Sequence, residues 1–184
     1  MTTDAKIHYV TGDATRDPFH SEAEGPPFLV HIVNDVGKWE SGFAAALSEV
    51  WPQAKERYLE WYEERSRTDK WAVPFELGAI QWVKVGYEEF VVNLIGQHSR
   101  IQDGEEKPIR YDAVRKGLAA LAVAALYEDE NDEEEPWLRG QIHMPRIGCG
   151  RARGEWSEIE KILQEEVIAR GIYVYVYDLP DGSE

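Results

Sequence analysis

The sequence predicts a layered α/β domain, and two observations carry that prediction. From the middle of the chain onward, runs typical of strands alternate with runs that have an apolar helical face. In addition, residues 28–33 are apolar at every position except His31, which is typical of a strand buried on both faces of a parallel or mixed sheet. No repeat, heptad array or domain linker interrupts the 184 residues, so we expect a single domain over 1–184.

The first half of the chain contains two expected strands and two expected helices. Residues 7–10 form a strand that ends at Thr11-Gly12-Asp13, and residues 20–27 are typical of a loop. After the strand at 28–33, residues 43–50 are predicted to be helical. Pro52 can begin a further helix over 53–67, in which three aromatic side chains at helical spacing are expected to be core: Tyr58, Trp61 and Tyr62.

The second half alternates more regularly. Two strands at 77–85 and 89–95 are joined near Gly86, and a helix is predicted over 109–127 with its apolar face on Val114, Leu118, Leu121 and Leu126. The acidic run 128–135 is interpreted as a solvated connection. A short strand at 141–144, a helix at 156–169 with Ser157 or a neighbour near its cap and Gly171 at its end, and a strand at 172–177 complete the pattern, before an acidic tail at 178–184.

Composition excludes several classes of protein. Thirty-five acidic against 20 basic residues give a formal charge of -15, which opposes binding of a polyanion over a broad surface but leaves room for a single nucleotide in a pocket. The lone Cys149 rules out an intramolecular disulfide and a multi-cysteine zinc site. No apolar run could span a bilayer and the first residues do not resemble a signal peptide, so we expect a cytoplasmic protein. No metal-ligand cluster is apparent, so we expect no metal. We also expect a monomer with no cofactor.

Two glycine-containing loops follow predicted strands and precede predicted helices. In the first, residues 34–42 connect a buried strand to a helix, which is where open α/β sheets bind ligands. In the second, Gly148 and Gly150 follow the strand at 141–144. Glycines let the backbone approach a phosphate closely, with amide groups directed at it. A turn with no ligand is the plainer interpretation of either glycine pair alone.

Several polar residues stand at strand ends, where each has a functional and a structural interpretation. Asp13 is placed to accept a hydrogen bond from a ligand amino group, or it shapes a turn. Gln97 and His98 line a pocket or belong to a solvated loop. His31 is a catalytic candidate or a hydrogen-bonded core histidine. Cys149, with no basic partner evident, is interpreted as a small loop residue.

With these loops in place, the chain resembles the macrodomain family, whose members bind ADP-ribose and its derivatives. The resemblance covers nearly the full length and rests on five segments in order: 12–14 (GDA), 31–42 (HIVNDVGKWESG), 93–97 (NLIGQ), 144–150 (MPRIGCG) and 174–179 (VYVYDL). Within the family, it is most similar to the branch of terminal ADP-ribose protein glycohydrolases and ADP-ribose-1''-phosphate phosphatases. The resemblance implies a three-layer α/β/α fold with a six-stranded mixed sheet.

The resemblance also implies roles for residues of the binding site. Asp13 and the backbone of Ala14 would hold the adenine amino group, and Tyr177 to Leu179, with Asp178 between them, would close over the adenine. Asn34 and Gln97 would face the distal ribose. Two loops would clamp the diphosphate: one with Gly37, Lys38, Trp39, Ser41, Gly42 and Phe43, the other with Ile147, Gly148, Cys149, Gly150 and Arg151.

The catalytic chemistry remains open among three water-based schemes. In glycohydrolases of this branch a lysine attacks the distal ribose and an aspartate resolves the adduct, but the matching positions here are Gln97 and Ala152. Asn34 and backbone amides could orient a water; Asp35 or His98 could act as general base; or His31 could act on a phosphate monoester. A base that works near pH 7 is most naturally a histidine.

These schemes lead to three functional hypotheses. The first is a hydrolase that removes ADP-ribose from modified acidic side chains or related esters, on proteins or on nucleic-acid ends. The second is an ADP-ribose-1''-phosphate phosphatase, and the third is a reader that binds ADP-ribose without turnover. An NAD-dependent dehydrogenase is disfavoured because no G-x-G-x-x-G follows the first strand.

Overall fold

A computed structural model describes residues 5–20, 25–39, 42–67, 72–98, 107–126 and 140–180. Within these ranges the helices and strands are, in chain order, β1 (Ile7–Thr11), η1 (Asp17–His20), β2 (Pro27–Asn34), α1 (Phe43–Val50), α2 (Pro52–Glu63), β3 (Ile80–Lys84), β4 (Phe90–Gln97), α3 (Tyr111–Ala125), β5 (Gln141–Pro145), α4 (Trp156–Glu166), η2 (Ile168–Arg170) and β6 (Val174–Asp178).

The six strands form one mixed sheet in the order β1-β6-β5-β2-β4-β3. Each neighbouring pair is parallel except β3 with β4, which is antiparallel. The predicted six-stranded mixed sheet is therefore confirmed. Because five strands run in the same direction, their carboxyl ends meet along one edge, and the loops that leave these ends lie side by side.

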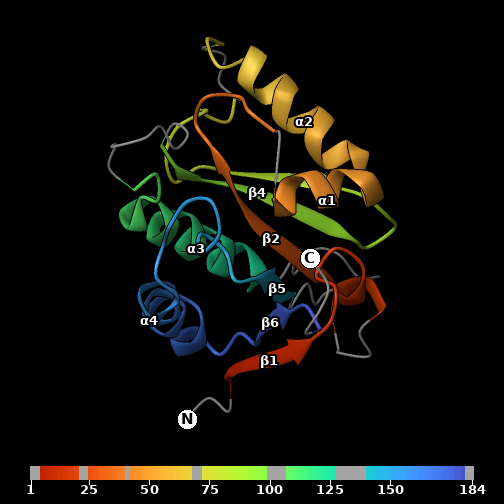
Figure 1. Ribbon diagram of the computed structural model, residues 1–184, viewed down its shortest axis with the longest axis vertical. Helices are drawn as coiled ribbons and strands as arrows, with labels where there is room; N and C mark the ends of the chain where they lie inside the picture. Colours follow the sequence, from red (N-terminus) through yellow and green to blue (C-terminus); the bar gives the residue numbers. More distant parts are fainter. Residues whose placement is uncertain are drawn as a thin grey trace.

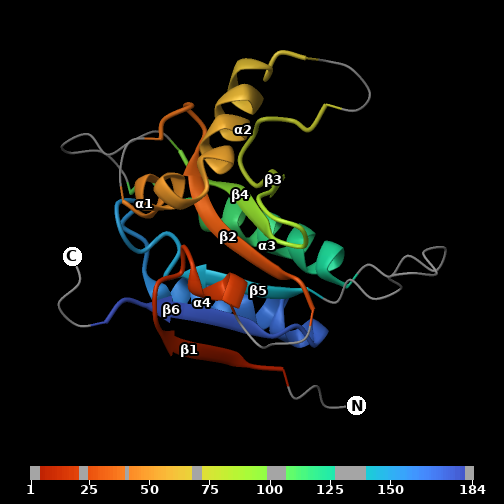
Figure 2. The same cartoon turned by 90° about the vertical axis from the view of Figure 1, so that its right-hand side faces the viewer.

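Helices cover both faces of the sheet and complete three layers. In Figures 1 and 2, α1 and α2 lie on one face, and α3 and α4 lie on the other. Residues alternate between these faces along β2: Leu29 packs with Leu47 and Tyr58 beneath α1 and α2, whereas Val30 packs with Leu118 beneath α3. This alternation within a run that is apolar on both sides explains why the strand at 28–33 was predictable.

A row of stacked rings crosses the sheet from β1 to β5. Tyr175 of β6 is sandwiched between His8 and His143, with ring centroids 4.8 Å apart on each side. The register places these three residues directly opposite one another. Burial lowers the pKa of His143 to about 4, so this histidine is neutral at physiological pH.

Element boundaries differ from the predicted ones mainly where glycine or a 3-10 turn intervenes. The strand expected at 77–85 begins only at Ile80, because Gly78 adopts a φ of 86°. The helix expected at 156–169 ends at Glu166 and continues as η2, after which Gly171 (φ 85°) ends it as predicted. Its N-cap is Glu155, two residues before Ser157, and no side chain makes a capping hydrogen bond there.

Smaller corrections apply elsewhere. The helix predicted over 53–67 spans only Pro52–Glu63, and η1 lies at the edge of a region interpreted as loop. The acidic run 128–135 lies outside the described residues. In the part of the chain that the structure covers, no helix is long and apolar enough to cross a membrane.

Candidate functional site

A pocket of about 240 Å³ lies where the loops after β2, β4 and β5 meet. Its position at the carboxyl ends of parallel strands is the usual place for a ligand in an open α/β sheet. It is lined by His31, Ile32, Gly42, Phe43, Ala44, Gln97, Pro145, Arg146, Ile147, Gly148, Gly150, Arg151 and Ala152.

The loop after β2 is held in shape by Asn34. Its Oδ1 accepts hydrogen bonds from the backbone N–H groups of Val36 and Lys38, each at 3.1 Å, and its Nδ2 donates to the carbonyl of Lys38 at 2.6 Å. The hydroxyl of Tyr58, from α2, also contacts Oδ1 at 3.0 Å. The hydrogen bonds of the Asn34 side chain thus mainly stabilise the conformation of this loop.

Glycines at positive φ shape this loop further. Gly37 has a φ of 68°, and a Cβ there would meet the ring of Tyr62 at 2.4 Å. Gly42 has a φ of 67° and forms the N-cap of α1, where its carbonyl accepts hydrogen bonds from Ala45 and Ala46. Ser41, predicted to bind the diphosphate, lies outside the described residues. Trp39 is buried against the rings of His31 and Tyr58.

The second loop closes tightly after β5. Gly148 has a φ of 73°, and its carbonyl accepts a 2.7 Å hydrogen bond from the N–H of Gly154. A Cβ at Gly150, by contrast, would meet nothing within 4 Å, so this glycine faces open space in the pocket. Burial raises the pKa of the Cys149 thiol, and a thiol that stays protonated agrees with its interpretation as a loop residue.

A cationic side chain links the two loops. Arg151 is exposed and lines the pocket, and its Cδ and Nε lie 3.8 Å from the place that a Cβ of Gly42 would occupy. The guanidinium therefore lies next to the first turn of α1, where backbone N–H groups have no partner within the helix. Together, the cation and the amides suit an anionic ligand.

His31 lies in the pocket wall but belongs to a buried hydrogen-bond relay. Gln81 Nε2 donates to the carbonyl of Arg57, and its Oε1 accepts from Asn93 Nδ2. Asn93 Oδ1 must then be the acceptor at the 2.6 Å contact with His31 Nε2. His31 is therefore the Nε2–H tautomer, and its Nδ1 has no partner among the described residues and is closed off from solvent.

Burial lowers the pKa of His31 to about 4, so the ring is neutral at pH 7. With its one proton held by Asn93 and its lone pair shielded, His31 is poorly placed to transfer a proton. The geometry favours the core-histidine interpretation of this residue over the acid–base one.

Asp35 and His98, which the sequence offered as separate candidates, form a pair. His98 Nδ1 lies 2.6 Å from Asp35 Oδ2, with the imidazole about half exposed and the carboxylate mostly covered. The backbone ties the pair to the pocket, because the N–H of Asp35 donates to the carbonyl of Gln97 at 3.2 Å. The carboxylate fixes Nδ1, so proton transfer by this ring would use Nε2.

The ends of β1 and β6 form the opposite limit of the site. Asp13 Oδ1 accepts hydrogen bonds from the N–H and hydroxyl of Thr15, and the N–H of Gly12 donates to the carbonyl of Asp178. Tyr177 is buried, with its hydroxyl 2.9 Å from His143 Nδ1, so only Asp178 and Leu179 remain at the surface to cover a ligand. Ala14 is buried beneath the same turn.

The predicted residues thus fall into two groups. Some line the pocket: His31, Gly42, Phe43, Gln97, Ile147, Gly148, Gly150 and Arg151. Of the others, Ser41 lies outside the described residues, and the rest lie in or next to the loops described above. Sequence reasoning assigned no role to Arg146, although it belongs to the segment that carries the resemblance. Among the described residues, no group of three or more His, Cys, Asp or Glu side chains could hold a metal ion.

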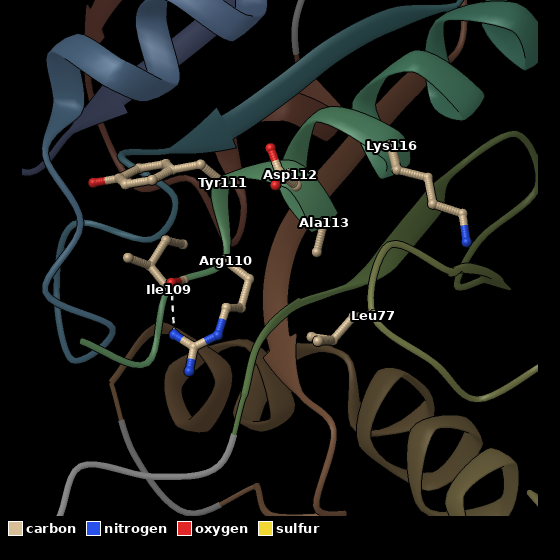
Figure 3. A pocket seen from close by; sticks show the side chains of 7 residues that line it. All are labelled: Leu77, Ile109, Arg110, Tyr111, Asp112, Ala113 and Lys116. Carbon is tan, nitrogen blue, oxygen red and sulfur yellow. Dashed lines mark hydrogen bonds between the residues drawn. The ribbon is translucent and has the colours of Figure 1, made fainter. Parts of the chain in front are cut away.

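A larger hollow of about 610 Å³ lies at the start of α3 and is shown in Figure 3. Its two cationic side chains already have partners: Lys116 pairs with Glu76 at 2.8 Å, and Arg110 donates to the carbonyl of Ile109 at 3.0 Å. The glycine loops do not reach it. We therefore take the smaller pocket as the functional site.

Fold and site together define an α/β/α domain with a ligand pocket at the carboxyl ends of its parallel strands. No family model matches the chain. A macrodomain protein from Streptomyces coelicolor is 36% identical, with a TM-score of 0.73, over 94% of this chain and 99% of that one. A protein of unknown function from Bacteroides thetaiotaomicron is 39% identical, with a TM-score of 0.80, over 96% and 99%. This chain belongs to the macrodomain family.

Two curated proteins and a further solved structure are more distant matches. Mouse chromodomain-helicase-DNA-binding protein 1-like is 26% identical over 95% of this chain, which spans only 18% of that protein's length. The bovine ADP-ribose glycohydrolase OARD1 is 33% identical over 69 residues, 38% of this chain and 40% of that protein. Thermosipho africanus DarTG, solved in complex with ADP-ribose, is 16% identical and shares the fold, with a TM-score of 0.65.

Proposed function

We propose that this macrodomain binds ADP-ribose and hydrolyses ADP-ribosyl derivatives, removing ADP-ribose from acidic side chains or related esters. The observation that carries the proposal is the Asp35 and His98 pair beside the pocket, at the ends of β2 and β4. Two similar proteins support the choice of ligand: bovine OARD1 is named an ADP-ribose glycohydrolase, and Thermosipho africanus DarTG was solved in complex with ADP-ribose.

The strand order supports one orientation of the ligand along the sheet edge. Asp13 and Asp178 stand at the β1 and β6 end, the Gly148 loop follows β5, and the loop after β2 and Gln97 stand at the β2 and β4 end. Adenine at the first end places the diphosphate between the glycine loops and Arg151. The distal ribose then lies next to Gln97 and the Asp35 and His98 pair.

In this orientation, His98 serves as a general base. Asp35 accepts a hydrogen bond from Nδ1–H of His98, and Nε2 takes a proton from a water whose oxygen bonds to the anomeric carbon of the distal ribose. The bond from that carbon to the carboxylate oxygen of the modified side chain breaks. The carboxylate leaves with the electron pair and needs no proton from the enzyme.

Two observations favour this scheme over the alternatives. The positions that resemble the catalytic lysine and aspartate of glycohydrolases hold Gln97 and a buried Ala152, neither of which can do that chemistry, and this disfavours a covalent lysyl adduct. A phosphatase that relies on His31 requires a proton transfer from a ring whose lone pair is shielded and whose proton is held by Asn93.

The test is turnover of a protein ADP-ribosylated on glutamate, with ADP-ribose-1''-phosphate as a second substrate. We expect release of ADP-ribose from the protein by the wild type. His98→Gln should lower kcat by about 100-fold or more with little change in KM, because general-base catalysis contributes about 10²–10⁴-fold. Asp35→Asn should also lower kcat, since the amide no longer fixes the imidazole tautomer.

The matched control is Glu60→Gln, which removes the carboxylate of an exposed ion pair with Arg57 on α2. It should leave kcat unchanged. Calorimetry with ADP-ribose should give similar affinities for wild type and His98→Gln. Binding without any turnover would make the protein a reader. Phosphate release as the sole reaction would make it a phosphatase, and either outcome overturns the proposal.

A further inference from the structure

Arg146, the first residue after β5, lies in a cluster of planar groups at the rim of the pocket. Its Nε and one terminal nitrogen donate to the two carboxylate oxygens of Asp178, at 2.6 and 2.7 Å. Its guanidinium carbon lies 5.1 Å from the ring centroid of Tyr9 and 5.2 Å from that of Trp156. Strands β1, β5 and β6 and helix α4 therefore all fix this one side chain.

The two aromatic rings do not sandwich the guanidinium. Their centroids are only 6.3 Å apart while each is about 5 Å from the guanidinium carbon, which is too close together for rings stacked on its two opposite faces. The rings are themselves held: the indole N–H of Trp156 donates to the Tyr9 hydroxyl, which donates to Glu160. The Arg146 side chain keeps 40% of its surface exposed and lines the pocket.

The charge of Arg146 is already paired with that of Asp178. Its role therefore differs from that of Arg151, which we assign to the diphosphate. The Asp178 carboxylate holds the pKa of Arg146 above its ordinary value, and Arg146 in turn lowers the pKa of Asp178. A paired, planar cation that is not sandwiched and stays 40% exposed is a weak partner for phosphate but a good one for an aromatic ring, because guanidinium groups stack on planar π-systems.

We propose that the open face of the Arg146 guanidinium is a stacking shelf for the base of the bound nucleotide. This inference rests on the proposed binding of ADP-ribose, and it adds a residue that discriminates ligands with a planar base from those without one. The shelf lies beside Asp178 and therefore at the β1 and β6 end of the site, where the base is expected.

The experiment compares two ligands by calorimetry: ADP-ribose and an abasic analogue in which hydrogen replaces the adenine. Arg146→Ala should weaken the binding of ADP-ribose by about 5- to 100-fold, the range for loss of one base-stacking contact. It should leave the affinity for the abasic analogue within about twofold of the wild-type value. Arg146→Lys should behave like Arg146→Ala, because it keeps the charge but loses the plane.

The outcomes separate this inference from the proposed function. If wild type does not bind ADP-ribose, the proposed function fails. If it binds and Arg146→Ala binds equally well, only the shelf is wrong. If Arg146→Ala weakens the binding of both ligands equally, or if Arg146→Lys binds ADP-ribose as tightly as wild type, Arg146 acts through its charge. Either result would also overturn the shelf.

A control variant guards against an effect of folding. Arg170→Ala removes another exposed arginine that contacts a carboxylate, Glu166, at the far end of α4. Its affinities for both ligands should match wild type. Thermal melting of Arg146→Ala and Arg146→Lys should show that both are folded at the temperature of the titrations.

Discussion

At the residue scale, Gly148 and Gly150 have different roles in the loop after β5. Gly148 has a positive φ and its Cβ would approach Ile109 Cδ1 to 2.7 Å, so the backbone requires glycine there. Gly150 has neither constraint and lines the pocket. One glycine therefore shapes the loop, and the other leaves room for a ligand.

We predict opposite phenotypes for substitutions at these glycines. Gly150→Val should leave the melting temperature unchanged and weaken ADP-ribose binding strongly, because the new side chain fills space that the ligand needs. Gly148→Ala should lower stability by about 1–3 kcal/mol through strain and overpacking. Thermal melting and calorimetry check both. A Gly150→Val protein that binds like wild type would place the ligand elsewhere.

At the element scale, helix α3 is fitted closely against the sheet. Gly117 lies in the middle of the helix, and a Cβ there would approach Leu94 Cγ on β4 to 2.6 Å. Glycine in a helix normally costs up to about 1 kcal/mol relative to alanine. Here the close approach of helix and strand outweighs that cost.

We therefore predict that Gly117→Ala destabilises the protein by about 1–3 kcal/mol in spite of its better helix propensity, because overpacking costs more than propensity gains. Val123→Ala, at an exposed position of the same helix, is the control and should change stability by less than about 0.5 kcal/mol. Urea unfolding of both variants is the measurement. Stabilisation by Gly117→Ala would contradict the described packing.

The elements themselves were largely predictable from the sequence because their patterns are strong. The apolar run before Asn34 and the apolar face of α3 both reflect burial that sequence periodicity records directly. Boundaries were less predictable, since Gly78 and the 3-10 turn after Glu166 depend on backbone geometry that composition does not determine.

The arrangement of the site was less predictable still. That Asp35 meets His98 depends on β2 pairing with β4, and that Arg146 meets Tyr9 depends on the order of β1, β6 and β5. These contacts join residues far apart in the chain. Burial of His31 and its link to Asn93 likewise required the packing of α1 and α2 over the sheet.

At the scale of the whole molecule, two buried neutral histidines make stability depend on pH. Burial lowers the pKa of both His31 and His143 to about 4, from the ordinary value of 6.5. Between these values the unfolded chain binds protons that the folded protein does not. Their contribution to stability is complete above about pH 6.5 and is lost as the pH falls toward 4.

We predict that the free energy of unfolding falls between pH 7 and pH 5, by an amount on the order of 2 kcal/mol for each histidine. His143→Phe keeps a ring beside Tyr175 and removes one titrating group, so it should reduce the slope. Urea unfolding at several pH values measures the effect; equal slopes in wild type and His143→Phe would contradict this assignment.

At this scale, we propose that the ligand site runs along the carboxyl edge of the sheet from β1 to β4. The most direct test is a crystal structure of the protein with ADP-ribose. We expect the base on Arg146, the diphosphate between the loops of Gly42 and Gly148, and the anomeric carbon of the distal ribose one water away from His98 Nε2. A ligand bound in the reverse direction, or one with its distal ribose far from His98, would contradict the account.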